Sequence, residues 1–551
     1  MMSVKVIIVC STLMIILLIG CGDDLDYSQR TAPLFENLGS YHYPVTTNSE
    51  LAQRYFDQGL ILAYGFNHRE AFRSFKEATI IDPNCAMGYW GMALVLGPNI
   101  NAPMDDSEIQ TAYDAIQEAI AVQDHVSEKE KDFIFALSKR YDENPPEDRS
   151  SLDLAYSEAM RQLVEKYPND VEAAALFSES LMDLHPWDFW LKDGTPQPWT
   201  QEILSSLENV IAMKVDHPGA NHLYIHAVEA SKNPEIGLES ADTLRELIPG
   251  AGHLVHMPSH IYIRVGKYHD GSLANEMAVK SDEEYLTQCY QQGLYPLAYY
   301  PHNYHFLWAT ATLEGRSELA IEAALKTSQK PPDSLLSVCG YETLQHYKVI
   351  PYHAYIRFGK WDEILNEPEP SDEYMYPKSI WHYARGMAFT AKNQMDRAKE
   401  ELQELKLISE DEEIDKLSIW GLNAASNLVK IASEILAGEI AAKQNNYNLA
   451  VEHLEKAIEI EHLLNYDEPP TWFFPVRHNL GAILLEAGRF EEAESVYRED
   501  LEEFPQNGWS LIGLIDALKK QNKLEEAQQY QEKFNEAWQY ADVTINSSRI
   551  L

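Results

Sequence analysis

Pairs of short helical segments recur along this chain with a period of about 34 residues, and this recurrence constrains its fold more than any other feature. In residues 55–83, the small residues Gly59 and Ala71 are spaced as two closely packed helices require, and Pro83 ends the second helix. Similar spacing returns in residues 481–505. No strand-like alternation of any length competes with it. The sequence therefore predicts an all-α chain of roughly nine to eleven helical pairs.

These units resemble the tetratricopeptide repeat (TPR), in which each repeat is a pair of antiparallel helices. The resemblance implies a TPR-type α-solenoid, a right-handed superhelix of such pairs, over residues 49–545. The most regular repeats fall at about 379–542. In TPR proteins the first helix of each pair lines a concave groove, so a functional surface is expected there.

Longer phrases are similar to those of a family of large exported bacterial TPR proteins. Among them are residues 64–68, 85–91, 97–101, 217–226 and 467–470. The resemblance covers nearly the whole chain after the leader. That family has no established activity, so the resemblance implies architecture and not function.

The first twenty residues predict export. Lys5 is followed by an almost uninterrupted apolar run that ends in Leu18-Ile19-Gly20-Cys21. A short charged start before an apolar stretch of this length is typical of a signal peptide. The last four residues resemble the bacterial lipobox, which implies that residues 1–20 are removed and that Cys21 is lipidated. A signal without lipidation, or an anchor left uncut, is the alternative.

Residues 21–48 are predicted to form a flexible acidic tether behind the lipid. Its cluster Asp23-Asp24-Leu25-Asp26 resembles the surface-export tag of some Bacteroidetes lipoproteins. A lipid anchor holds a protein on a bilayer without embedding it. We therefore expect a location in the cell envelope, at the outer membrane and facing outward.

The charge of the chain argues against one class of partner. It has 86 acidic and 44 basic residues, a net charge of −42 at pH 7. Such a surface repels the phosphate backbone of nucleic acids, which are excluded as partners. The five cysteines include no Cys-x-x-Cys pair and are too few for a disulfide framework.

Histidine follows the repeat. Nine of the 19 histidines fall between residues 217 and 305, and His222 and His226 are followed 34 residues later by His256 and His260. Histidine recurs at positions 2, 5 and 9 of the first helix of successive units, which cluster within about 60° around a helix. These side chains are therefore expected to face a groove over residues 175–360.

A stack of imidazoles suits a transition metal, because imidazole is a common neutral ligand of zinc and copper. Two histidines four residues apart on a helix can reach one ion, and neighbouring helices lie about 10 Å apart. Glu229 could serve as a ligand, as an acceptor that orients an imidazole, or as a base. The alternative is that the histidines are structural. The candidate metal ligands are His222, His226, His253, His256, His260, His302 and His305.

A groove without metal is a second interpretation. Arginine and histidine could bind a carboxylate, sulfate or phosphate of an anionic peptide or glycan. Two acidic residues have groove-facing spacing on an earlier helix, although solvated side chains explain them equally well. The candidate ligand-groove residues are Glu229, Arg264, His346, His353, Arg357, Glu179 and Asp183.

Two further segments have a structural and a functional interpretation. Trp187, Trp190 and Trp199 could form a sugar-stacking platform, or they could pack against a long loop. Residues 467–472 form an acidic, proline-containing connection, interpreted as structural.

Three functions remain open from the sequence. The first is a non-enzymatic binding scaffold at the cell envelope that holds its ligand in the groove through a histidine-bound zinc or copper ion. The second is a metal-dependent enzyme with Glu229 as base. The third is a protein–protein adaptor in an envelope or glycan-uptake assembly, in which the histidines have no part.

Overall fold

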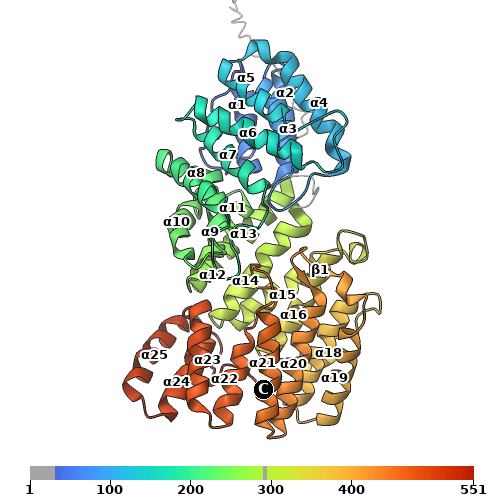
Figure 1. Ribbon diagram of the computed structural model, residues 1–551, viewed down its shortest axis with the longest axis vertical. Coiled ribbons are helices and arrows are strands. Elements are labelled where there is room, and N and C mark those ends of the chain that lie inside the picture. Colours follow the sequence, from blue (N-terminus) through green and yellow to red (C-terminus); the bar gives the residue numbers. More distant parts are fainter. Residues whose placement is uncertain (1–31, 289–294) are drawn as a thin grey trace, which may run out of the picture. The chain divides into compact units, whose positions relative to one another are not determined.

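The computed structural model describes residues 32–288 and 295–551 of the chain. The predicted signal peptide, Cys21 and the start of the predicted tether lie outside these residues. Regular secondary structure in the described part is almost entirely α-helix, and successive helices pack against one another as hairpins (Figure 1). The fold is the predicted all-α, TPR-type solenoid.

The helices of the first half run from blue to green in Figure 1. They are α1 (Glu50–Tyr64), α2 (His68–Ile81), α3 (Ala86–Leu94), α4 (Ile109–Val122), α5 (Glu128–Ser138), α6 (Ser150–Lys166), α7 (Val171–Asp183), α8 (Thr200–Met213), α9 (Pro218–Val228), α10 (Leu238–Leu244), α11 (Gly252–His256), α12 (Pro258–Arg264) and α13 (Tyr268–Gln288).

The second half continues from light green to red, with one short antiparallel hairpin of strands between α19 and α20. Its elements are α14 (Tyr300–Leu313), α15 (Ser317–Gln329), α16 (Gln345–Arg357), α17 (Trp361–Asn366), α18 (Met375–Ala391), α19 (Met395–Ser409), β1 (Ser418–Ile419), β2 (Asn423–Ala424), α20 (Ala425–Lys443), α21 (Tyr447–Glu461), α22 (Val476–Glu486), α23 (Phe490–Glu503), α24 (Gly508–Lys520) and α25 (Leu524–Ala537).

Many of the turns between paired helices have the same backbone conformation. In α1–α2 and in the hairpins from α12–α13 onward, the chain enters the left-handed region two residues after the first helix ends. Glycine and asparagine tolerate this conformation best. Gly266 (φ 79°) and Asn445 (φ 61°) are examples. In the first hairpin, α1–α2, the same place is taken by Phe66, with φ 53°. A bulky side chain in this conformation is unusual, and Phe66 lies at the site described below.

Small residues set the spacing between helices, as the repeat pattern predicts. A Cβ atom on Gly59 of α1 would lie 2.7 Å from the ring of Phe75, and one on Gly91 of α3 would lie 2.4 Å from the same ring. Phe75 on α2 is fully buried between them. Side chains at these glycines would force the three helices apart.

The predicted tether is shorter than expected. Residues 32–48 pack on the solenoid, with Leu38, Tyr41 and Tyr43 buried. The hydroxyl of Tyr41 donates to Glu172 on α7, and the backbone N–H of Thr46 donates to Glu130 on α5 over 2.6 Å. The prediction of a flexible segment up to residue 48 was wrong because it relied on the acidic start and did not weigh these aromatic residues.

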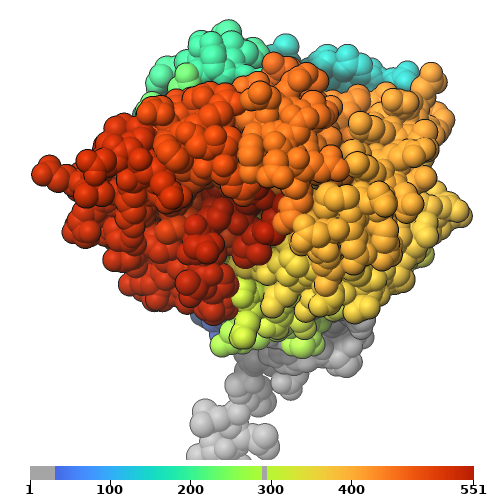
Figure 2. Space-filling view, turned by 90° about the horizontal axis from the view of Figure 1, so that it is seen from below, coloured from blue at the N-terminus to red at the C-terminus, as the bar shows by residue number. Residues whose placement is uncertain are grey.

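The C-terminal segment after α25 folds back onto the repeats. Figure 2 shows this segment, in the darkest red, inside a hollow between the red, orange and yellow helices. The side chain of Ser548 is fully buried and donates to the carbonyl of His478 on α22 over 2.6 Å. The chain thus fills this hollow with its own residues.

Candidate metal centre

The imidazoles predicted to share a groove meet inside the solenoid. They come from the first helices of neighbouring hairpins, and Pro258 divides one of these helices into α11 and α12. Most of the side chains are buried. His222 and His226 lie on α9, Glu229 follows at its end, His253 and His256 lie on α11, His260 on α12 and His302 on α14.

The first set of converging imidazoles is His222, His226 and His253. One ring nitrogen from each lies within 4.8 Å of the other two. The Nε2 atoms of His222 and His253 are 3.2 Å apart. Within the described residues, Nε2 of His226 has no hydrogen-bond partner.

The second set is His256, His260 and His302, whose ring nitrogens also lie within 4.8 Å of one another. The Nε2 atoms of His256 and His260 are 2.9 Å apart. The two sets are neighbours, because the ring centroids of His226 and His260 are separated by only 5.5 Å.

Glu229 connects the two sets. Its Oε1 lies 2.7 Å from Nδ1 of His226, and its Oε2 lies 2.5 Å from Nδ1 of His260. The hydroxyl of Tyr466 also donates to Oε2, over 3.2 Å. One carboxylate therefore orients an imidazole in each set. One of its carboxylate oxygens forms a third group at ligand spacing with a ring nitrogen of His226 and one of His260.

Hydrogen bonds fix the tautomers of four rings. Nδ1 of His222 lies 2.6 Å from the carbonyl oxygen of Tyr64, which can only accept, so Nδ1 carries the hydrogen. His256 donates from Nδ1 to Oδ1 of Asn275 over 2.7 Å, because the amide of Asn275 is itself turned to donate to the carbonyl of Gly271. The carboxylate of Glu229 imposes the same tautomer on His226 and His260.

This leaves lone pairs pointing at one another. If both rings are neutral, Nε2 of His256 and Nε2 of His260 are both acceptors, yet the two atoms are 2.9 Å apart. Two acceptors repel unless a cation lies between them. Zinc binds histidine at about 2.0–2.1 Å, so two imidazoles on one tetrahedral ion are separated by about 3.3 Å. The residues present therefore fit a transition metal.

Four of these imidazoles are held in the neutral form. Burial lowers the pKa of His222, His253, His256 and His302 well below the ordinary value of 6.5, and the neighbouring imidazoles lower it further. These rings are neutral at pH 7, which is the form that binds a metal.

The Glu229 carboxylate is held in its charged form. Burial alone raises its pKa, but attraction to His260 and the hydrogen bonds from His226 and His260 lower it below the ordinary value of 4.5. A carboxylate with a low pKa and both oxygens occupied is a weak base. The structure therefore favours Glu229 as an orienting residue over the predicted role as base.

Aromatic side chains close the first set on one side. The ring of Phe66 lies 4.6 Å from that of His222 and 5.4 Å from that of His253. Trp187 meets His226 edge-on at 5.1 Å. Apolar surroundings of this kind restrict solvent access and so control the chemistry of a bound ion.

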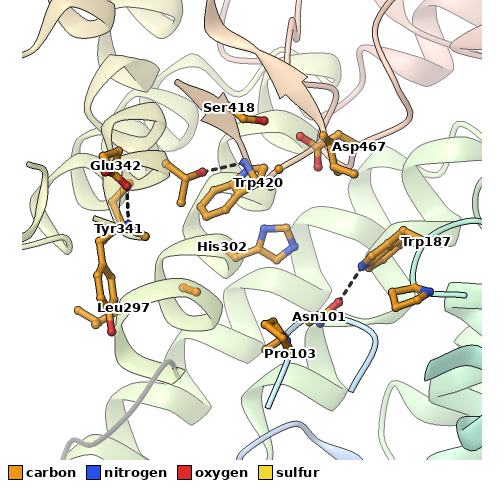
Figure 3. Close-up of a pocket in the computed structure, with 18 of the residues that line it drawn as sticks. Asn101, Pro103, Trp187, Leu297, His302, Tyr341, Glu342, Ser418, Trp420 and Asp467 are labelled. Atoms are coloured by element: carbon orange, nitrogen blue, oxygen red, sulfur yellow. Dashed lines mark hydrogen bonds between the residues drawn. The ribbon is translucent and has the colours of Figure 1, made fainter. Parts of the chain in front are cut away.

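A cavity of about 1330 Å³ opens beside both sets. Its lining includes His226, Glu229, His253, His260 and His302, while His222 and His256 do not reach it. Figure 3 shows Trp187, Trp420 and Asp467 around His302 in this hollow. Each set thus has histidines that face the cavity and one that lies behind.

The other predicted histidines, His305, His346 and His353, belong to neither of the two sets. His305 stacks on Trp308 with ring centroids 5.4 Å apart, and its ring meets that of His346 edge-on. Nδ1 of His346 lies 3.0 Å from the hydroxyl of Tyr376. His353 packs against Trp472. None of these three belongs to a converging set among the described residues.

The two arginines predicted to bind an anion in the groove do not line the cavity. Arg264 lies over the ring of Tyr466, and Nη2 of Arg357 faces Nδ1 of His478 at 2.9 Å. Arg357 also donates to the carbonyl of Ser548 in the C-terminal segment over 3.2 Å. The prediction was wrong for Arg357 because the chain's own end covers that part of the groove.

In the acidic pair on α7, the side chain of Asp183 is buried and Glu179 is partly buried. Asp183 accepts from Nη2 of Arg140 over 2.6 Å and lines the cavity. Burial raises the pKa of Glu179 to about 8 and that of Asp183 to about 6, against the attraction of Arg140. The structure thus places Asp183, but not Glu179, at the cavity.

Three residues of the site were not predicted from the sequence. Asn275 on α13 and the backbone of Tyr64 orient imidazoles, and Tyr466 reaches Glu229 from a loop after α21. The sequence predicts a structural role for residues 467–472, although Asp467 lines the cavity. The only signal in the sequence for these residues is that Tyr466 immediately precedes this acidic segment.

Comparison with known families agrees with the fold. Models of the tetratricopeptide repeat match residues 435–461 and 484–531, which lie in α20–α21 and in α22–α25. The chain is thus a helical-solenoid protein that contains tetratricopeptide repeats. No curated protein matches its sequence.

Solved structures with distant similarity are helical repeat proteins. Human IFIT1 bound to m7Gppp-AAAA has 11% identity and a TM-score of 0.31, over 89% of this chain and 91% of that one. Yeast Tom70 has 13% identity and a TM-score of 0.27, over 88% and 90%. The Cut9-Hcn1 hetero-tetramer of the APC/C has 11% identity and a TM-score of 0.28, over 89% of this chain and 74% of that one. Function is not transferable at this distance.

Within residues 32–288 and 295–551, no helix combines the length and the apolar character needed to cross a bilayer.

Proposed function

We propose that this protein is a metal-binding TPR scaffold in which two adjacent three-histidine sites hold zinc or copper beside a ligand-sized cavity. One observation carries the proposal: the Nδ1 atoms of His222, His226, His256 and His260 are tied to acceptors, so that their Nε2 lone pairs converge. Orienting partners of this kind accompany nearly all metal-binding histidines.

The donor set favours borderline and soft ions. Neutral imidazoles suit zinc and copper, whereas magnesium and calcium prefer oxygen ligands. Three protein ligands leave a fourth position free on a tetrahedral ion. Because His226, His253, His260 and His302 face the cavity, a ligand held there would reach that position.

A metal-dependent enzyme is the second candidate, favoured by the direct opening of both sets onto the cavity. A metal with a free position can activate water or polarise a substrate. Asp467 is better suited than Glu229 to transfer a proton there, because burial raises its pKa to about 6. Its Oδ2 accepts one hydrogen bond, from Thr471 over 2.7 Å.

Metal titration of the purified chain tests the proposal. The full chain in detergent would be stripped with a chelator and titrated with Zn(II) and with Cu(I), with bound metal measured by elemental analysis. We expect two ions per chain. The double variant His222→Ala/His256→Ala should lose both, because it removes one ligand from each set.

Two controls separate ligands from other buried histidines. His382→Ala removes an imidazole that bonds to Glu401 outside the site, and it should leave the metal content unchanged. Absence of stoichiometric metal in the wild type, or its retention in the double variant, would overturn the proposal. A protein–protein adaptor would then be the better description.

We also propose that lipidation of Cys21 anchors the scaffold in the cell envelope, at the outer membrane. The lipobox-like sequence before Cys21 supports this. Metabolic labelling with palmitate in a bacterial host tests it. Wild-type protein should be labelled and Cys21→Ser should not, whereas equal labelling would contradict the proposal.

A further inference from the structure

Left-handed backbone occurs at three large aromatic residues, two of which line the cavity. Among the described non-glycine residues with positive φ, four are the Asn and Gln residues that end helices. The others are Phe66, Trp187 and Trp420, with φ of 53°, 59° and 53°. This conformation costs roughly 1–2 kcal/mol for a residue with a Cβ atom. Such strain concentrates at binding sites, where it fixes a side chain in place.

Trp420 projects from the tip of the β1–β2 hairpin. The backbone N–H of Leu422 donates to the carbonyl of Ile419 over 2.9 Å, so Trp420 and Gly421 are the two central residues of a tight turn. Both have positive φ, a pattern that usually requires Asn-Gly. The backbone N–H of Trp420 is fastened to the hydroxyl of Thr343 over 2.8 Å. The turn therefore places the indole of Trp420 at the cavity, although Asn would fit this backbone conformation better.

Trp187 reaches the same cavity from the loop between α7 and α8 (Figure 3). Its indole N–H donates to Oδ1 of Asn101 over 3.1 Å, and the amide of Asn101 donates in turn to the hydroxyl of Tyr299 over 3.1 Å. The indole is thus anchored by its edge, and it is only partly buried. Its neighbours Trp190 and Trp199 do not line the cavity.

The polar lining suits a ligand that donates hydrogen bonds and carries no negative charge. Carboxyl groups such as those of Asp467 and Glu468 line the cavity, together with the amides of Asn99 and Asn101. The cations in the lining are Arg149 and Lys416. Arg149 pairs with Asp153 at 3.0 Å and Lys416 with Glu413 at 2.5 Å. No unpaired Arg or Lys side chain in the described lining would receive an anion, so only an ion held by the histidine sets could do so.

The volume of the cavity further limits the class of ligand that it can bind. The cavity of about 1330 Å³ exceeds the range of about 300–1,000 Å³ that is typical for a single small molecule. A purely apolar occupant would leave the carboxylates without partners, which is costly. Flat rings with apolar faces and hydroxyl edges satisfy both the indoles and the acceptors.

We propose that the cavity binds a neutral oligosaccharide whose sugar rings stack on Trp187 and Trp420 beside the histidine sets. This deepens the proposed function by naming the chemical class of its ligand. It also replaces the anionic ligand expected from the sequence, because the arginines behind that expectation do not line the cavity.

Calorimetric titration with defined oligosaccharides tests the inference. The probes are cellohexaose, xylohexaose, maltohexaose, mannohexaose and chitohexaose, with a hexamer of galacturonic acid as the anionic comparison. We expect at least one neutral probe to bind. Trp187→Ala and Trp420→Ala should each raise its Kd by about tenfold, the effect of losing one stacked ring.

Trp199→Ala is the matched control, since Trp199 stacks on His185 outside the cavity and its loss should leave the Kd unchanged. Metal content is measured on the same samples, so that failure of the metal proposal is read separately from failure of this one. Binding of no neutral probe, binding of the galacturonic acid hexamer alone, or equal Kd values in all variants would overturn the inference.

Discussion

Oε2 of Glu229 lies 2.5 Å from Nδ1 of His260, and this contact pairs the two buried side chains across hairpins. Glu229 follows α9, whereas His260 belongs to α12. The other oxygen of the same carboxylate holds His226. Because a carboxylate only accepts, it fixes the hydrogen on Nδ1 of both rings at once and turns both Nε2 lone pairs toward the proposed ions.

Replacing Glu229 by Gln should weaken metal binding by about 10- to 100-fold. The amide oxygen can still accept from one imidazole, but the amide NH₂ faces the other and forces it into the wrong tautomer. Competition with a chelator of known affinity measures the change. Glu401→Gln is the control, because Glu401 also bonds a histidine and a second partner, His382 and Arg385, away from the centre. Equal affinity in both variants would contradict the orienting role.

Metal binding should resist mild acid. The pKa values of His222, His253, His256 and His302 lie well below 6.5, so these rings stay neutral as the pH falls through 6.5. At these four ligands, protons compete with the metal only at the lower, folded-state pKa values. The increase in Tm caused by zinc should therefore be similar at pH 8 and pH 6.5 and should disappear only in more acidic solution. A loss centred at pH 6.5 would mean that the ligands are exposed histidines.

The register of the repeat predicted much of this centre from sequence. A spacing of 34 residues between His222 and His256 places both on the same face of neighbouring first helices. Helical periodicity, however, does not say how far a side chain reaches across a groove. Periodicity alone therefore predicted His305 as a ligand, whereas in the structure His305 stacks on Trp308.

Long-range contacts elsewhere in the chain have no signal in the sequence. Tyr466 reaches Glu229 from a distant loop, and the chain end covers Arg357. Neither contact follows from a local pattern. The left-handed backbone at Phe66 was also beyond prediction, because sequence favours Gly or Asn at that place in a hairpin.

The strain at Trp420 predicts an unusual order of stabilities. Glycine adopts its φ of 53° freely and alanine does not, so Trp420→Gly should be more stable than Trp420→Ala by about 1 kcal/mol. Trp381 lies inside α18, where glycine is the poorer helix former, so its two variants should show the opposite order. Thermal melts of the four variants measure both orders. Equal or reversed melting temperatures for the Trp420 pair would mean that the turn is unstrained.

The buried end of the chain should stabilise the C-terminal repeats without affecting the metal. Ser548→Ala removes the hydroxyl that donates to the carbonyl of His478 and that bonds to the hydroxyl of Tyr497 at 2.7 Å. Buried groups left without partners cost roughly 1–3 kcal/mol. Ser547→Ala, at a less buried neighbour, should cost little.

Hydrogen exchange measures the loss of stability caused by Ser548→Ala in individual helices. In Ser548→Ala the amides of α22 and α23 should exchange faster, while those of α9 and α11 should not change, because stability in a solenoid is transmitted mainly between neighbouring repeats. Bound metal should stay at the wild-type level, since the His222 and His256 sets lie on other hairpins. If metal were lost together with the protection of α22, the two halves of the chain would be energetically coupled and the metal centre would depend on the buried C-terminal segment.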